Sequence, residues 1–323
     1  MKFKIKDLFK IEKKPKKGLM AIEWVMFGYL LLTLLVILFC YTKVQNPNAM
    51  IWGRVHIAVT TLLMWAVYRM VPCRIMRLLR VVVQMSLLSW WYPDTYEINR
   101  MLPNLDHVFA SWEQQLFGCQ PALLFAEKCS NMVFSELMCL GYVSYFPLIL
   151  LVEVYYFFMR YADFSRCAFI VLTSFFIYYV IFILVPVTGP MFYYLAVGTE
   201  EIARGVFPNV GNYFNFHQEM LPTPGYTDGF FYQMVVDTHD AGERPTAAFP
   251  SSHVGITTVL MWLAWKAKSR RLLLLMLPFY VLLCFSTVYI MAHYTIDAVA
   301  GLVCGTLLYR AMLGLYTQKK GLR

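Results

Sequence analysis

Charge is scarce in this chain. Of its 323 residues, 15% are charged and 59% are hydrophobic, whereas a soluble domain usually carries about 25% charged and 45–50% apolar residues. The mean hydropathy of +0.56 points the same way. These values exclude an ordinary water-soluble enzyme and a disordered or fibrous protein. The sequence therefore predicts an integral membrane protein.

Paired cysteines are also missing. None of the eight cysteines forms a Cys-x-x-Cys pair, so a zinc or redox motif has no support. Most lie inside apolar runs, where cysteine behaves as a small hydrophobic residue. Cys119 and Cys129 share one polar stretch, and a disulfide between them is an open alternative if that stretch is extracytoplasmic.

Long apolar runs are abundant, and the first follows eight lysines in residues 1–17. This run is too long for a signal peptide, so we expect an uncleaved first span. The sequence predicts an all-α, polytopic membrane helix bundle with about eight transmembrane helices, or seven and an interfacial segment. The expected spans are 19–42, 51–70, 76–92, 134–158, 167–187, 252–266, 272–291 and 295–315, of which the second and third are the weakest.

The spans divide the chain into parts. A basic cytoplasmic N-terminus (1–18) precedes the N-terminal transmembrane helices (19–92), and an amphipathic segment (93–133) is expected at the outer interface. The membrane core follows (134–315). It contains a long outer loop (188–250), and loops of this length are usually functional. Residues 316–323 form a cytoplasmic tail.

The positive charges are unevenly distributed over these spans. If the N-terminus is cytoplasmic, 22 of the 28 Lys and Arg residues fall on the cytoplasmic side and 6 fall outside. This bias is the positive-inside pattern of multi-pass membrane proteins. It accounts for the net charge of +9 without a nucleic-acid partner, and it places both termini in the cytoplasm.

Two polar segments stand out at the ends of expected spans. Residues 244–253 read Arg-Pro-Thr-Ala-Ala-Phe-Pro-Ser-Ser-His, and residues 286–301 contain His293 and Asp297. One span, a basic turn and a second span separate the two segments. Because two crossings return the chain to its starting face, His253 and His293 are expected on the same, extracytoplasmic side.

These residue types suit phosphoryl transfer. His293 and Asp297 are spaced i, i+4, so a helix would make them neighbours, with the carboxylate accepting a hydrogen bond from the imidazole. Ser286 lies on the same stripe, and Ser251 is a good N-cap for a helix whose first turn favours an anion. Two alternatives remain: the histidines are interfacial polar groups, or the His/His/Asp set binds a metal.

The two segments resemble the signature of the type-2 phosphatidic acid phosphatase superfamily, whose membrane members act on lipid phosphates. Residues 250–253 match its Pro-Ser-x-His motif, and Ser286, His293 and Asp297 match its second motif. The resemblance implies that His293 is the nucleophile that forms a phosphohistidine, that Asp297 orients it, and that His253 protonates the leaving group. It implies no metal and no organic cofactor.

Some positions depart from the usual signature. Thr287 stands where an arginine is expected, and Ala248-Phe249 precedes the first motif; both features resemble the branch that contains inositol-phosphorylceramide synthases. Asp106, and residues 116–118 and 186–190, are similar to other recurring elements of that branch. Arg244 is the best external cation for phosphate, together with Ser251 and Ser286, whereas His217 and His239 are expected to be ordinary loop residues.

The expected function is head-group phosphotransfer of the inositolphosphotransferase type. A membrane lipid phosphate is the donor, and water or an alcohol or ceramide-type molecule is the acceptor. A lipid phosphate or pyrophosphate phosphatase is the first alternative, because it shares the nucleophile and differs in the acceptor. A non-catalytic lipid-binding membrane protein is the second.

Overall fold

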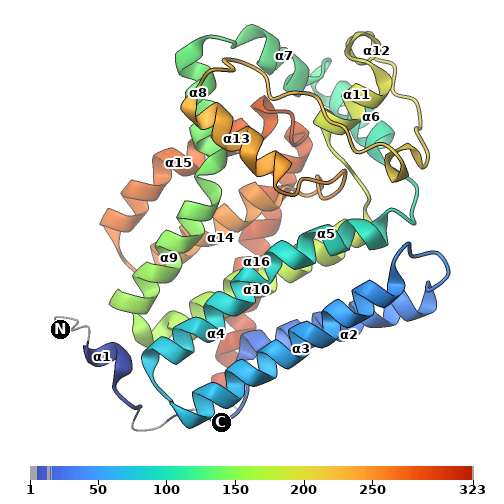
Figure 1. Cartoon of the computed structure of the whole chain (residues 1–323). Coiled ribbons are helices and arrows are strands. Elements are labelled where there is room, and N and C mark those ends of the chain that lie inside the picture. Colours follow the sequence, from blue (N-terminus) through green and yellow to red (C-terminus); the bar gives the residue numbers. More distant parts are fainter. Residues whose placement is uncertain (1–5, 13–14, 16, 322–323) are drawn as a thin grey trace.

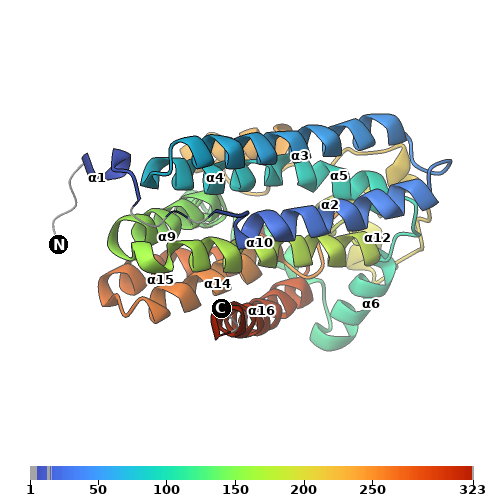
Figure 2. The same cartoon turned by 90° about the horizontal axis from the view of Figure 1, so that it is seen from below.

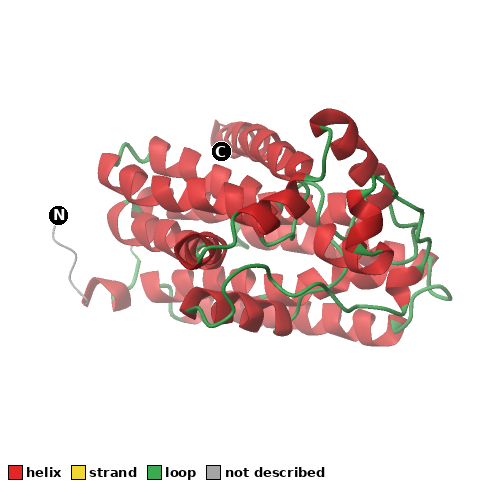
Figure 3. Ribbon diagram, turned by 90° about the horizontal axis from the view of Figure 1, so that it is seen from above, coloured by secondary structure: helices red, strands yellow, loops and turns green. Residues whose placement is uncertain are grey.

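The computed structural model describes residues 6–12, 15 and 17–321. In this part of the chain the regular structure is helical, apart from one isolated β-bridge between Ile11 and Cys73 (Figure 3). The prediction of an all-α membrane bundle is confirmed. The elements in chain order are α1 (Lys6–Phe9), α2 (Ala21–Phe39), α3 (Pro47–Met70), α4 (Arg74–Ser86), α5 (Leu88–Asn99), α6 (Asp106–Phe117), α7 (Pro121–Lys128), α8 (Met132–Val143), α9 (Tyr145–Met159), α10 (Tyr161–Leu184), α11 (Pro190–Val197), α12 (Thr199–Ala203), a short 3₁₀ turn η1 (Tyr213–Asn215), α13 (Phe230–Asp240), α14 (Ser252–Lys266), α15 (Arg270–Tyr289) and α16 (Thr295–Gly321).

All eight expected spans fall on helices. Among the described residues, five helices are long and apolar enough to cross a membrane, namely α2, α3, α10, α15 and α16, and the α8–α9 pair adds a sixth if it forms one span. The α14 helix has 15 residues, fewer than the roughly 20 that a full crossing needs. The α4–α5 pair carries several charged side chains and does not meet the same test.

The α8–α9 pair bends by 46°, where the sequence predicted one continuous span. The break lies at Ser144, whose hydroxyl donates to the Gly141 carbonyl at 2.6 Å. Pro147 follows three residues later and has no N–H for the carbonyl of Val143, so the regular hydrogen-bond ladder cannot continue through this turn.

Two buried ion pairs hold the N-terminal helices together. The Arg54 guanidinium on α3 binds the Asp94 carboxylate on α5 through two hydrogen bonds of 3.0 and 2.6 Å. Arg80 on α4 binds Glu23 on α2, with Nε and Oε1 2.7 Å apart. All four side chains are at most 3% exposed. Arg54 and Arg80 are therefore neutralised inside the bundle, as intramembrane charges generally are.

Helix α10 lies between these N-terminal helices and the C-terminal α14, α15 and α16 (Figure 2). Glycines allow α16 to approach α14 closely. A methyl group added at Gly305 would overlap the carbonyl oxygen of Gly255, and one at Gly301 would overlap that of Ser251. Gly301 and Gly305 form a Gly-x-x-x-Gly pair, a pattern that brings membrane helices into close contact. The start of α16 is thereby fixed against the start of α14.

The short helices gather at one end of the bundle (Figure 1). The expected outer segment 93–133 forms the end of α5, α6 and α7, and the expected loop 188–250 is not structureless, since it contains α11, α12, η1 and α13. Helix α1 and the last turns of α16 lie at the opposite end. Both termini of the described chain therefore lie on one side of the bundle.

The structure bears on the alternative of a disulfide between Cys119 and Cys129. Cys119 and Cys129 are free; helix α7 occupies eight residues of the segment between them, so the alternative of a disulfide is not realised.

Several of the basic residues counted on the cytoplasmic side lie outside the described residues, namely Lys2, Lys4, Lys13, Lys14, Lys16 and Arg323.

Candidate functional site

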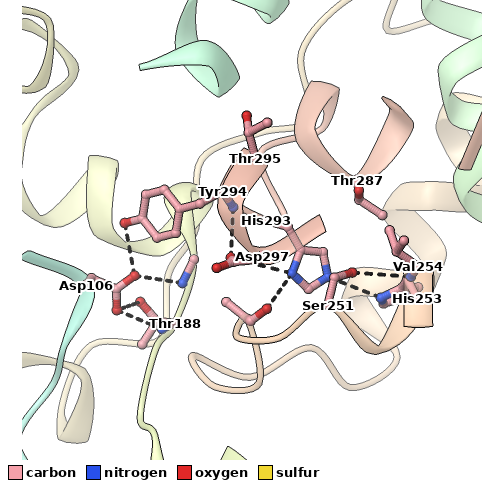
Figure 4. Close-up of polar contacts among 12 residues, drawn as sticks. Asp106, Thr188, Ser251, His253, Val254, Thr287, His293, Tyr294, Thr295 and Asp297 are labelled. Atoms are coloured by element: carbon pink, nitrogen blue, oxygen red, sulfur yellow. Dashed lines mark hydrogen bonds and ion pairs between the residues drawn. The ribbon is translucent and has the colours of Figure 1, made fainter. Parts of the chain in front are cut away.

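The two candidate histidines meet where α14 and α16 begin. His253 is in the first turn of α14, and His293 lies in the turn between α15 and α16. The Nε2 atom of His293 is 3.4 Å from the Nδ1 atom of His253, with the ring planes at 66° (Figure 4). The expectation that the two residues share one side of the membrane core agrees with this contact.

A main-chain carbonyl orients His293. Its Nδ1 atom lies 2.8 Å from the carbonyl oxygen of Ala248, and a carbonyl oxygen only accepts hydrogen bonds. The proton of the neutral imidazole is therefore on Nδ1, which leaves the lone pair of Nε2 directed at His253. The main-chain N–H of His293 donates to the main-chain carbonyl of Thr287 at 3.0 Å, which holds the backbone of His293 against the end of α15.

His293 and Asp297 are neighbours, as expected, but the prediction that they share one helix face is wrong. Helix α16 begins only at Thr295, so His293 precedes the helix. The nearest Asp297 carboxylate oxygen is 3.8 Å from Nδ1 of His293, too far for a hydrogen bond. That oxygen instead accepts the main-chain N–H of Tyr294 at 2.9 Å. Asp297 therefore caps the turn that carries His293 and supplies a nearby charge.

Both chain segments that meet at His293 are strained. Ala247 and Met291 have φ angles of 68° and 62°, in the left-handed region that residues with a side chain seldom adopt. The Met291 carbonyl accepts the N–H of Met191 at 2.8 Å, and the N–H of Ala248 donates to the Val187 carbonyl at 3.0 Å. Strained residues that the surrounding structure holds in place are typical of functional sites.

Aromatic rings surround His253. Tyr142 on α8 stacks on its imidazole with 4.8 Å between ring centroids, and Tyr145 on α9 lies at 4.4 Å. His239 on α13 packs edge-on against the same Tyr142 ring at 5.7 Å. His239 was expected to be an ordinary loop residue, but its side chain is buried. This burial lowers the pKa of His239 to about 4. The tyrosines gave no signal because aromatic residues are common throughout the spans.

Electrostatics favour a neutral nucleophile. Burial lowers the pKa of His293 to about 4, partly opposed by the Ala248 carbonyl and by the negative charge of Glu243. At neutral pH the imidazole is therefore uncharged and its Nε2 lone pair is free to attack. Sequence reasoning missed Glu243, which lies in the outer loop beside Arg244 and accepts a hydrogen bond of 2.7 Å from the hydroxyl of Tyr92. Burial raises the pKa of Glu243.

The three candidate phosphate-binding residues differ in position. Ser251 is the N-cap of α14, as predicted, with its hydroxyl accepting the N–H of Val254 at 3.3 Å. The Ser286 hydroxyl is used inside α15, where it donates to the Leu283 carbonyl at 3.0 Å. Arg244 donates to the Glu243 carbonyl at 3.1 Å. The described contacts therefore bring only Ser251 beside the histidine pair.

Asp106 fastens the neighbouring loop to the site. Its buried carboxylate accepts hydrogen bonds from the main-chain N–H groups of Thr188 and Gly189 at 2.7 and 2.9 Å, and from the Tyr294 hydroxyl at 3.1 Å (Figure 4). Gly189 has a φ of 96° and leaves no room for a side chain beside the Ala292 carbonyl. Asp106 thus ties the element that the sequence singled out at 186–190 to the turn that carries His293.

Glu113 on α6 makes a second such connection. Its Oε1 atom accepts the N–H of Thr295, the first residue of α16, at 2.8 Å. Burial raises the pKa of this carboxyl group to about 7. Acidic groups stabilise a helix N-terminus, so Glu113 fixes the point at which α16 begins. An isolated glutamate in an amphipathic segment gave no sign of this role.

The described residues contain no group of three or more His, Cys, Asp or Glu side chains arranged to hold a metal ion. The site consists of two histidines in contact, His253 and His293, with the Asp297 carboxylate beside His293. This arrangement supports covalent catalysis with acid–base assistance.

Comparison with known proteins gave one match. A family model described as the PAP2 superfamily matches residues 107–311, which is more than half of the chain and includes the histidine pair and Asp297. No curated protein sequence and no solved structure matches the chain.

Proposed function

Because the chain belongs to the PAP2 superfamily, we propose that it is an integral membrane enzyme that transfers phosphoryl-type groups from lipid phosphates through a phosphohistidine at His293. The observation that carries the proposal is the contact between Nε2 of His293 and Nδ1 of His253 at 3.4 Å. A nucleophile and a proton donor at this distance are suited to act on one substrate phosphorus.

The proposed reaction has two steps. In the first, the Nε2 lone pair of His293 attacks phosphorus, the bond to the lipid oxygen breaks, and His253 donates a proton to the leaving oxygen. In the second, His253 removes the proton from the acceptor hydroxyl, whose oxygen attacks phosphorus and breaks the N–P bond. The Ala248 carbonyl keeps the proton on Nδ1 of His293 throughout, and Asp297 offsets the positive charge that develops on the ring.

Phosphate binding is proposed to rely on main-chain groups. The first N–H groups of a helix have no partner inside the helix and attract anions. In α14 the N–H of Val254 is bound to Ser251, and we assign those of Ser252 and His253 to the phosphate. Ser251 contributes by fixing this turn. Arg244 uses one of its five N–H donors on the Glu243 carbonyl and keeps others with which it would bind phosphate. Ser286 would support α15 rather than bind phosphate.

The acceptor is proposed to be an alcohol, as in inositolphosphotransferases and sphingolipid head-group transferases. Thr287, which stands where the usual signature has an arginine, and Ala248-Phe249, which resembles the sequence of this branch, support the proposal. The lipid phosphatase alternative uses the same residues with water as acceptor. We further propose that the site faces the extracytoplasmic side, with both termini in the cytoplasm.

The test is to trap the intermediate and then vary the acceptor. Purified protein in nanodiscs, given lipid labelled with ³²P at phosphate, is expected to form an acid-labile and base-stable phosphoprotein that His293→Ala abolishes and His217→Ala retains. Addition of inositol or ceramide separates the two reactions. Release of free phosphate as the sole product would exclude the transferase, and unchanged labelling of His293→Ala would exclude the phosphohistidine.

A further inference from the structure

An apolar groove begins beside the residues that adjoin the histidine pair. It has a volume of about 390 Å³ and is bounded by α7, α15 and α16. Helix α14 packs against both α15 and α16, while these two have little contact with each other. Helices α15 and α16 therefore diverge where they pack on α14. The buried Val254 of α14, which directly follows His253, lines the bottom of the groove between them.

The lining of the groove is apolar apart from its mouth. Along α16 it includes Thr295, Ala298, Val299 and Leu302, spaced i, i+3, i+4 and i+7, which is one face of a helix. This face extends over about 10 Å at 1.5 Å per residue. Thr295, two residues after His293, is the polar residue at the end nearest the site. The groove thus runs from the site into the part of the bundle formed by spanning helices.

The groove is open to the surroundings along its length. Phe285, Val299 and Leu302 are 57%, 58% and 46% exposed, and α15 and α16 are two of the five helices that meet the requirements of a membrane span. A molecule in the bilayer can therefore enter sideways. The volume is within the range of about 300–1,000 Å³ typical of ligand sites, and none of the described residues that line the groove is charged.

We propose that this groove binds an acyl chain of the lipid phosphate whose phosphorus reacts with His293. The inference rests on the proposed function and specifies how the substrate is held. An apolar chain at one end of the site and a phosphate at the first turn of α14 would place the scissile bond between them. Phe285 on α15 and Leu302 on α16 both line the groove and would contact the chain, and Thr295 would lie at the boundary between chain and phosphate.

The test is photolabelling in phosphatidylcholine nanodiscs. The probe is phosphatidic acid with a diazirine on one acyl chain, and a phosphatidylcholine with the same chain reports the bulk lipid. Adducts of the phosphatidic acid probe are expected to concentrate in residues 284–302, relative both to the phosphatidylcholine probe and to the exposed face of α2. Equal labelling by the two probes would mean that only bulk lipid fills the groove, and would overturn the proposal.

A pair of variants tests the position. Leu302→Trp narrows the groove and is expected to lower specific labelling about tenfold, which corresponds to a loss of about 1.4 kcal/mol of binding free energy. Leu307→Trp changes an exposed leucine of the same helix outside the groove and is expected to label like the wild type. Equal loss in both variants, or loss in neither, would overturn the proposal. Labelling needs no turnover, so a protein that binds the probe in the groove but transfers no phosphoryl group would contradict the proposed function alone.

Discussion

The Nδ1 atom of His293 lies 2.8 Å from the carbonyl oxygen of Ala248. In many hydrolases a carboxylate occupies this position and fixes the tautomer of the catalytic histidine. Here a main-chain group does so, and substitution of a side chain cannot remove it. The orientation of His293 is therefore separated from the charge of Asp297, which lies 3.8 Å away.

This separation predicts unequal effects of two substitutions. His293→Ala should lower kcat by about 10⁴-fold or more, because the nucleophile is lost. Asp297→Asn should lower it by only about 10- to 100-fold, since the tautomer persists and only charge stabilisation is removed. Steady-state kinetics with a lipid phosphate measures both, with the exposed Asp228→Asn as control. An equal loss in the two variants would show that Asp297 orients the ring after all.

The loss of kcat on removal of His253 is expected to be larger for a substrate with a poorer leaving group. His253→Asn should lower kcat by about 10²–10⁴-fold for a lipid alcohol, the usual value of general acid catalysis. With p-nitrophenyl phosphate the loss should be much smaller, because that leaving group departs without a proton. The exposed His217→Asn provides the control. A loss of the same size with both substrates would contradict a role in proton donation.

The pH dependence follows from the buried imidazole. Since burial lowers the pKa of His293 to about 4, the acid limb of kcat/KM should be centred near pH 4 rather than near 6.5. Glu243 faces His293 and raises its pKa, so Glu243→Gln should move the limb to still lower pH, while the loop variant Glu219→Gln should not. The groups that also face this ring are His253 and Asp297.

The same shift affects stability. A histidine whose pKa is lowered in the folded state binds a proton more readily in the unfolded chain, so stability should fall as the pH drops from about 6.5 towards 4. Thermal unfolding in detergent measures this loss, and His293→Ala should reduce it. An acid limb near pH 6.5, together with stability unchanged over this range, would show that the ring is solvated.

The contact between α14 and α16 predicts a stability difference between two glycines of one helix. Gly305→Ala would place a methyl group against the Gly255 carbonyl, whereas Gly314 has nothing within 4 Å. The first substitution should lower the free energy of unfolding by about 1–3 kcal/mol, and Gly314→Ala should raise it by about 0.5–1 kcal/mol. Denaturation followed by tryptophan fluorescence compares them, and similar values for both would show that the helices are not in close contact.

Periodicity and motif spacing were enough to locate the helices and the histidine pair. Apolar runs place every expected span on a helix, and the capping preference of serine identifies Ser251 as the N-cap of α14. Counting two crossings predicts that His253 and His293 lie on the same side, and their contact in the structure agrees with this. These features depend on composition and on local preference, which a single sequence contains.

The remaining features depend on tertiary contacts. The i, i+4 spacing of His293 and Asp297 suggested one helix face, but α16 starts later because Glu113, far away in sequence, accepts the N–H of Thr295. The Ala248 carbonyl has no side-chain signature that could identify it. The short helices of residues 190–240 are too short for a clear periodic pattern of apolar residues. They are stabilised by packing against the bundle, as α13 packs on α8.

The ion pairs of the N-terminal helices have a consequence for biogenesis. Arg54 on α3 is separated by 40 residues from its partner Asp94 on α5, and Arg80 on α4 by 57 residues from Glu23 on α2. In each pair, the helix that is synthesised first, α3 or α2, therefore carries a charge whose counterion has not yet been translated. An unpaired charge costs about 2.5–3.5 kcal/mol on insertion scales when it lies at the centre of a membrane helix, and the cost is smaller for Glu23, which lies in the first turn of α2. These helices are thus expected to leave the insertion machinery together, as one preassembled unit.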